Sequence, residues 1–170
     1  MSDSQDKNIR NAVIVMGGAG AGAIAFGGFS LFIMQMQKLM LEADGLSKAS
    51  EGGMPIEELV LRLHELWTQW MPWLSVLGVF WVVCAVLLGF GGIRWRGLSL
   101  IAVAAGMVWV VGYSLSSRSY VQLFCEQITA FFPEIGLTMS MGFGHASVVF
   151  SACVMLLFPI TAGTLLIRLS

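Results

Sequence analysis

The sequence predicts an all-α integral membrane protein, a four-transmembrane-helix antiparallel bundle with two interfacial amphipathic helices. Hydrophobic residues make up 57% of the 170 positions and charged residues 11%, whereas a soluble domain is about half apolar and about a quarter charged. The charges leave free runs at 11–37, 66–93, 97–117 and 135–167, each at least as long as the roughly 20 residues that cross a bilayer as a helix. This composition argues against a soluble enzyme, and the net charge of −1 gives no sign of nucleic-acid binding.

We expect a single membrane domain over residues 1–170, with spans at about 12–36 (span one), 72–93, 97–116 and 140–166. Span one is too long for the apolar part of a signal peptide, so we interpret it as a retained helix. The second and third spans are joined only by Arg94-Trp95-Arg96. Such a short connection predicts that these two spans are antiparallel neighbours.

Residues 55–71 form the first predicted amphipathic segment. Pro55 suits a first helical turn, and Glu57 and Glu58 suit a helix N-terminus. The apolar residues that follow keep the i, i+3, i+4, i+7 spacing of one helical face, with charged and amide side chains opposite. We expect this helix either to lie in the membrane interface or to extend the second span, with Pro72 as the corner between them.

Residues 119–132 form the second amphipathic segment. Tyr120, Phe124 and Phe131 share a helical face, and Glu126 lies opposite. Pro133 ends the segment. We predict a helix that rests at the membrane surface, and a re-entrant or pocket-covering segment stays open as an alternative.

The distribution of Lys and Arg predicts the orientation of the bundle. An even number of spans places both termini on one side, together with Lys7, Arg10, Arg94, Arg96 and Arg168. The other side carries fewer basic residues in longer segments, and its first loop is rich in acids. The positive-inside tendency therefore predicts cytoplasmic termini, and we expect a bacterial inner (plasma) membrane.

Small residues recur at helical spacing in all four spans. Because lipid provides no hydrophobic drive for helix association, small side chains favour packing by letting backbones approach closely. Span one is the richest, with glycine on more than one face, so it could contact both the bundle and a second subunit. The predicted helix-packing residues are Gly18, Gly22, Gly28, Gly78, Gly89, Gly106, Gly144 and Ser147.

The polar side chains of the spans gather in one layer. In an antiparallel bundle, the end of span one, the start of the second span, the end of the third and the start of the fourth lie at one level. Span one ends with Gln35 and Gln37, and His64 and several tryptophans lie at the start of the second span. Tyr113 and Ser114 end the third span, and His145 lies near the start of the fourth. From this layer we select His145, His64, Trp70, Tyr113 and Gln35 as candidate ligand-binding residues. A structural alternative for His145 is a hydrogen bond to a neighbouring helix, beside Ser114, Tyr113 or the Gln35 end of span one.

No cofactor follows directly from this layer. A histidine in it could hydrogen-bond a quinone or a lipid headgroup. A haem held by two histidines would require both His64 and His145, the only histidines in the chain. The three cysteines form no C-x-x-C pair, so we predict no metal site.

The sequence favours a small non-catalytic subunit or assembly factor of a larger membrane complex, since the span cores carry no charge and no catalytic motif is present. Two alternatives stay open: a membrane-embedded redox or lipid/quinone-binding enzyme that uses the layer around His145, and a self-associating channel or transporter. The expected partners are the lipid bilayer and either other membrane subunits or a second copy bound through span one.

Overall fold

A computed structural model of the chain describes residues 3–42, 56–131, 133 and 137–169. Four long α-helices account for most of these residues: α1 (Asp3–Glu42), α3 (Ile56–Gly91), α4 (Arg96–Phe131) and α5 (Leu137–Ile167). A single 3₁₀ turn, η1 (Gly92–Trp95), links α3 to α4. Gly92 has φ of 61°, a left-handed conformation that glycine adopts without steric penalty, and it allows the chain to reverse there.

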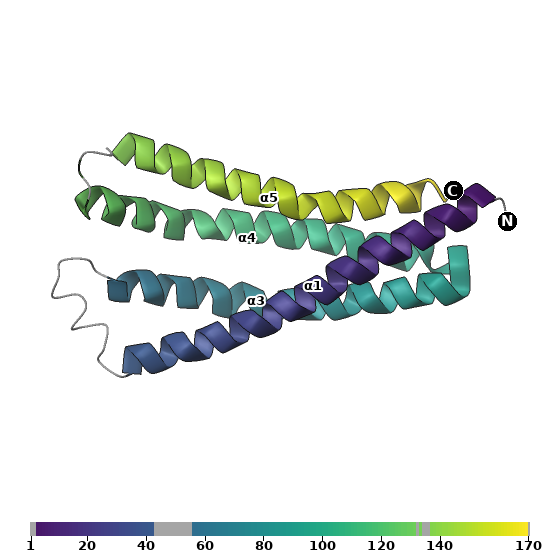
Figure 1. Cartoon of the computed structure of the whole chain (residues 1–170), viewed down its shortest axis with the longest axis horizontal. Coiled ribbons are helices and arrows are strands. Elements are labelled where there is room, and N and C mark those ends of the chain that lie inside the picture. Colours follow the sequence, from purple (N-terminus) through teal and green to yellow (C-terminus); the bar gives the residue numbers. More distant parts are fainter. Residues whose placement is uncertain (1–2, 43–55, 132, 134–136, 170) are drawn as a thin grey trace.

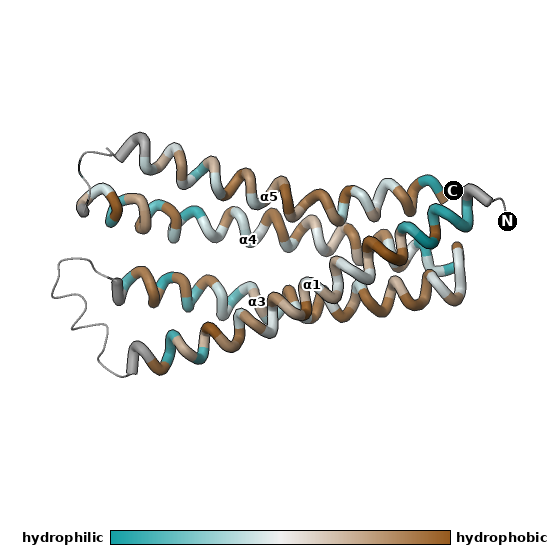
Figure 2. Tube along the Cα trace, in the orientation of Figure 1, coloured by the Kyte–Doolittle hydropathy of each residue, from teal (hydrophilic) through white to brown (hydrophobic). Residues whose placement is uncertain are grey.

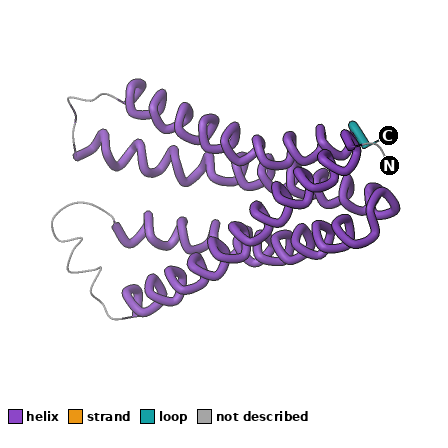
Figure 3. Tube along the Cα trace, turned by 45° about the vertical axis from the view of Figure 1, so that its right-hand side comes forward, coloured by secondary structure: helices purple, strands orange, loops and turns teal. Residues whose placement is uncertain are grey.

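The helices run alternately up and down, and both termini lie at the same end of the molecule (Figure 1). We call this the terminal end, which also holds η1, and we call the opposite end, where α1 ends and α3 begins, the loop end. The pair α1/α3 lies apart from the pair α4/α5 at the loop end, and the pairs meet at the terminal end (Figures 1 and 3). There Arg96 Nη2 donates a hydrogen bond of 3.5 Å to Ile167 O and ties the start of α4 to the end of α5.

The buried core lies toward the terminal end, where the two pairs meet. Its residues come from all four helices: Ile9, Ala12, Met16, Trp81, Cys84, Ala85, Leu88, Ala102, Val103, Ala162, Leu166 and Leu169. Elsewhere many large apolar side chains are exposed, and Phe90, Val108 and Phe150 each expose more than two thirds of their surface. Such an apolar exterior is the surface that a membrane protein presents to lipid.

Apolar residues lie along the middle part of the helices, and hydrophilic residues gather near the N-terminus of α1 (Figure 2). Three continuous helical stretches are long and apolar enough to cross a membrane: Gln5–Leu39, Glu58–Ala130 and Ser140–Ile167. The second stretch contains α3, η1 and α4, which fold back on each other (Figure 1). The chain is therefore an all-α integral membrane protein, although its described residues form three such apolar stretches rather than the four predicted from the charge-free runs.

The two amphipathic segments are not separate helices, which corrects the prediction for 55–71 and 119–132. From Ile56 the first segment continues through Pro72 as one helix, α3. The second forms the last turns of α4, which ends at Phe131, because no glycine or proline interrupts the chain between Tyr113 and that residue. Pro55 and residue 132 lie outside the described residues. The alternative that the first segment extends the following span agrees with this geometry.

Two facing glycines allow a close backbone approach between α1 and α3. A Cβ atom built on Gly20 would lie 2.7 Å from the carbonyl oxygen of Gly78, and one built on Gly78 would lie 2.7 Å from the carbonyl oxygen of Gly20. The same face of α1 continues to Gly27, where a Cβ atom would overlap the Ser75 hydroxyl. No side chain larger than hydrogen fits between the helices at this crossing.

This crossing predicts the effect of a Gly20→Leu substitution. Inserting side-chain atoms into a filled contact typically destabilises a protein by about 1–3 kcal/mol, and here the obstacle is backbone. We expect a clearly lower thermal unfolding temperature in mild detergent.

The matched control is Gly28→Leu, because no atom lies within 4 Å of a Cβ atom built on Gly28. Equal unfolding temperatures for the two variants would contradict the α1–α3 crossing.

Candidate functional site

A cavity of about 360 Å³ lies between the four helices, next to the buried core. Every helix contributes to its wall, and most of the wall is apolar. It is lined by Gly18, Ala19, Gly22, Ala23, Phe26, Met71, Leu74, Leu77, Gly78, Trp81, Gly106, Trp109, Val110, Tyr113, Val154, Met155, Phe158 and Pro159.

The cavity exists because α1 presents glycine and alanine at four of its five positions in the wall, with Phe26 as the fifth. Gly18 and Gly22 line the cavity, and neither has an atom within 4 Å of the position that a Cβ atom would take. Gly20, which lies between them in the sequence, faces α3 instead. One helix therefore uses one set of glycines for packing and another set to leave space.

Two tryptophans connect α3 to α4 by hydrogen bonds, in the part of the cavity wall that these two helices form. Trp81 Nε1 of α3 donates to Ala102 O at 2.8 Å, and Trp109 Nε1 of α4 donates to Trp70 O at 3.1 Å. Gly106 makes room for the first indole, since a Cβ atom there would lie 2.7 Å from the Trp81 ring. The second bond reaches Trp70 O, two residues before Pro72, in the turn where proline leaves the Thr68 carbonyl without its helical N–H partner.

An aromatic cluster extends this wall toward the loop end. The Trp109 and Tyr113 rings stack with centroids 5.2 Å apart, and Trp70 meets both rings edge-on at 6.4 and 6.5 Å. Trp70 occupies the space beside Gly112, where a Cβ atom would overlap its ring. Of the predicted ligand-binding residues, the structure thus brings Trp70 and Tyr113 together.

His145 does not join that cluster. Its side chain is exposed, and its Nδ1 atom lies 2.7 Å from Met141 O of its own helix. The register of α5 explains this, because Gly144 packs on Val121 and Cys125 of α4 and so turns the next residue away from the bundle. The prediction that His145 contacts Ser114, Tyr113 or the Gln35 end of α1 is therefore not confirmed.

The predicted packing residues fall into three groups. Gly78, Gly106 and Gly144 lie where an added Cβ atom would be within 3.0 Å of another helix, and one at Gly89 would make an ordinary 3.8 Å contact with Val13. The sites of Gly18, Gly22 and Gly28 are open, as described above. Ser147 is exposed and donates to Gly144 O.

Unpaired polar atoms mark a second feature near the loop end. Four buried side-chain atoms of α1 and α3 have no hydrogen-bond partner among the described residues: Gln37 Oε1, His64 Nδ1, Trp70 Nε1 and Ser75 Oγ. Gln37 is only 9% exposed, whereas Gln35, one of the predicted ligand-binding residues, is exposed. A buried stripe on α1 distinguishes them, since Gly27, Ser30, Met34 and Gln37 repeat at intervals of three and four residues.

Gln37 and His64 lie at the same level of the α1/α3 interface. Thr68 Oγ1 lies 3.5 Å from Met34 Sδ, which fixes the register of these antiparallel helices. Gln37 is about one turn beyond Met34 in α1, and His64 is about one turn before Thr68 in α3. A buried acceptor and a buried imidazole nitrogen therefore share one region, and both lack a partner within the described chain. No group of three or more His, Cys, Asp or Glu in the described chain could hold a metal ion.

The fold defines a class: a small all-α integral membrane protein with an apolar cavity between its helices. Within this class the chain belongs to the ThrE family, described as putative threonine/serine exporters, which it matches over residues 33–166. The match begins near the end of α1 and covers α3, α4 and most of α5. Searches of curated proteins and of solved structures returned no match. Family membership favours the transporter alternative and gives no support to a non-catalytic subunit.

The two indole bonds predict selective sensitivity to replacement of tryptophan. Trp81→Phe and Trp109→Phe each remove a donor to a helix carbonyl, so we expect each to lower the free energy of unfolding by about 1 kcal/mol or more. Denaturant titration in detergent, followed by circular dichroism, measures this change.

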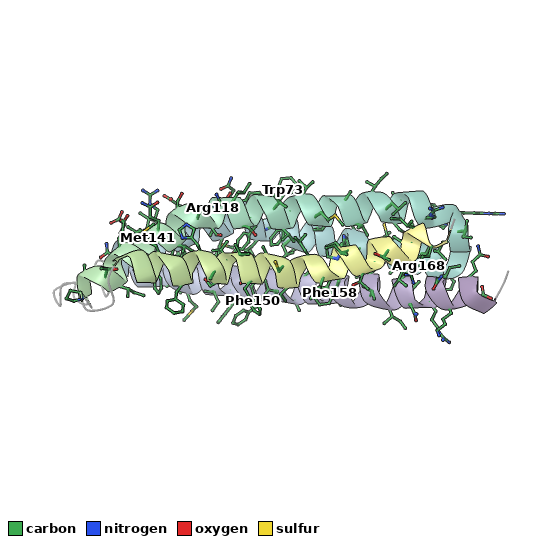
Figure 4. All side chains as sticks on the ribbon, turned by 90° about the horizontal axis from the view of Figure 1, so that it is seen from above. Trp73, Arg118, Met141, Phe150, Phe158 and Arg168 are labelled. Carbon is green, nitrogen blue, oxygen red and sulfur yellow. The ribbon has the colours of Figure 1, made fainter. Side chains whose placement is uncertain are left out.

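Trp73→Phe provides the comparison, because Trp73 is 65% exposed on the outer surface (Figure 4). If Trp73→Phe destabilised the protein as much as the other two variants, the indole bonds between α3 and α4 would not be the cause.

Proposed function

We propose that the protein is a membrane exporter whose substrates are small hydroxy amino acids, threonine and serine. Membership of a family of putative threonine/serine exporters over 33–166 carries this proposal. The helical structure with its apolar exterior is consistent with it. Neither the subunit hypothesis nor an enzyme built around His145 has comparable support, since the His145 side chain points away from the bundle.

The proposed arrangement has four spans and cytoplasmic termini in a bacterial inner membrane. Each of the four helices has at least 31 residues, and at about 1.5 Å per residue each exceeds the roughly 30 Å hydrocarbon core. The terminal end carries Lys7, Arg10, Arg94, Arg96 and Arg168, which favours the cytoplasmic side for that end. The loop end, with Gln37 and His64, then faces outward.

Gln37 and His64 are the proposed polar contacts of the substrate. A threonine or serine zwitterion carries ammonium and hydroxyl donors that an amide oxygen such as Gln37 Oε1 can accept, and His64 Nδ1 can accept or donate according to its tautomer. Both atoms are buried without a partner in the described chain. A ligand that satisfies them would remove the free-energy cost of leaving them unpaired.

Self-association is the second part of the proposal. The charge-free runs supply no Asp, Glu, Lys or Arg inside the bilayer, and the cavity of one chain is almost entirely apolar. A zwitterion would lose its hydration in that cavity without compensating hydrogen bonds. We therefore infer that the polar path across the membrane lies between copies of the chain.

Efflux from proteoliposomes loaded with radiolabelled threonine tests the exporter and its polar contacts together. We expect efflux well above that of protein-free liposomes, and at least a tenfold loss in Gln37→Leu, since a hydrogen bond to a charged group contributes about 1.5–3 kcal/mol. Gln35→Leu is the matched control, because Gln35 has the same chemistry two residues away and is exposed.

The two parts of this test fail separately. Absence of threonine and serine efflux from the folded wild-type protein would contradict the exporter. Equal losses in Gln37→Leu and Gln35→Leu, with wild-type efflux intact, would contradict only the assignment of Gln37.

Membrane-impermeant thiol labelling of cells tests the four-span topology. In a chain without its native cysteines, we expect Ser50→Cys to react in intact cells and Ser4→Cys to react only after permeabilisation. Ser4 lies in the first turn of α1 and position 50 follows the helix in the sequence, so labelling of both from the same side would contradict a crossing by that helix.

A further inference from the structure

We propose that the cavity between the four helices binds one alkyl chain of a bilayer lipid. This site is distinct from the polar contacts assigned to Gln37 and His64, and the proposal does not depend on which substrate is exported. It rests on the chemistry of the cavity wall, on the volume of the cavity and on its opening toward the membrane.

Few polar side-chain groups line the cavity. The Trp81 and Trp109 indoles donate to helix carbonyls at 2.8 and 3.1 Å, and the Tyr113 hydroxyl is the other polar side-chain group of the wall. A buried water molecule needs about two to four polar partners, and the remaining lining side chains are aliphatic, aromatic or thioether. The wall therefore favours an apolar occupant over water or an amino acid.

The volume suits an extended apolar group. About 360 Å³ is more than twice the roughly 150 Å³ of an engineered apolar cavity that binds benzene. An empty cavity of this size would forfeit dispersion contacts along its whole wall. A flexible methylene chain can follow the gap between α1 and α5 and restore those contacts.

The opening identifies the bilayer as the source of the chain. Phe26 of α1 and Val154 and Phe158 of α5 line the cavity, and each also exposes more than two fifths of its surface. These residues lie at the outer surface, where Figure 4 shows Phe150 of the same helix directed away from the bundle. The cavity thus reaches the lipid-facing surface between α1 and α5, at a depth where acyl chains are the surrounding solvent.

Brominated lipids test this site in the full-length chain. The protein is reconstituted in bilayers of phosphatidylcholine with dibrominated acyl chains, and quenching of tryptophan fluorescence is compared with that in unbrominated bilayers. Trp81 is 5% exposed and lines the cavity, so bromine contacts it efficiently only from inside the cavity, whereas Trp109 also lines a separate groove with Trp73 and Val108. Trp81 is one of the six tryptophans of the chain, and we expect Gly22→Phe to lose its share of the quenching.

Gly28→Phe is the matched control, because Gly28 also has open space around it but does not line the cavity. Gly18→Phe fills the cavity from a second position and keeps the test decisive if Gly22→Phe fails to fold, which thermal unfolding reveals. Equal quenching in wild type, Gly28→Phe and a folded cavity-filling variant would overturn the proposal. Loss of quenching in all three variants alike would also overturn it, since the loss would then not depend on the cavity.

Discussion

The backbone contact between Gly20 and Gly78 determines how α1 sits on the rest of the molecule. At each glycine the carbonyl of the other glycine takes up part of the space that a side chain would need, so the two backbones approach closely. In lipid, where burial of apolar surface gives little drive for association, such close packing and its dispersion contacts hold helices together. The rotation of α1 about its axis follows, because the face with Gly20 must meet α3, and Gly18 and Gly22 are then turned toward the cavity.

The contacts of α4 with α3 and with α5 depend on side-chain hydrogen bonds rather than on facing glycines. α3 and α4 are joined by indole N–H groups bonded to helix carbonyls, whereas α4 and α5 exchange hydrogen bonds between Cys125 and Ser140. Because the indole N–H groups of Trp81 and Trp109 donate to these carbonyls, the cavity wall that the two rings form is apolar. The unpaired atoms of Gln37 and His64 lie outside this wall, and the bundle therefore separates an apolar region from a polar one.

Much of the fold could be predicted from the sequence, because hydrophobic length and the absence of charge determine where helices lie in a bilayer. The small residues predicted a tight bundle, but not which glycine faces which helix, since Gly18, Gly20 and Gly22 occur in one run with glycine or alanine on every side. The candidate site was less predictable. Composition placed His145 in the polar layer, but its direction depends on Gly144 packing against α4, a tertiary contact that the sequence does not show. Pro72 was expected to turn the chain, and instead α3 continues through it with support from another helix.

The face of α1 that meets α3 can be measured directly by disulfide cross-linking. A Cβ atom built on Gly17 lies 3.8 Å from Ala85 Cβ, which is close to the mean Cβ–Cβ separation of about 3.8 Å in disulfides. In a chain with its three native cysteines replaced, the Gly17→Cys/Ala85→Cys pair should oxidise readily in membranes, and the Gly18→Cys/Ala85→Cys pair should not. Efficient cross-linking of the second pair with little of the first would contradict the glycine contact on which the structure depends.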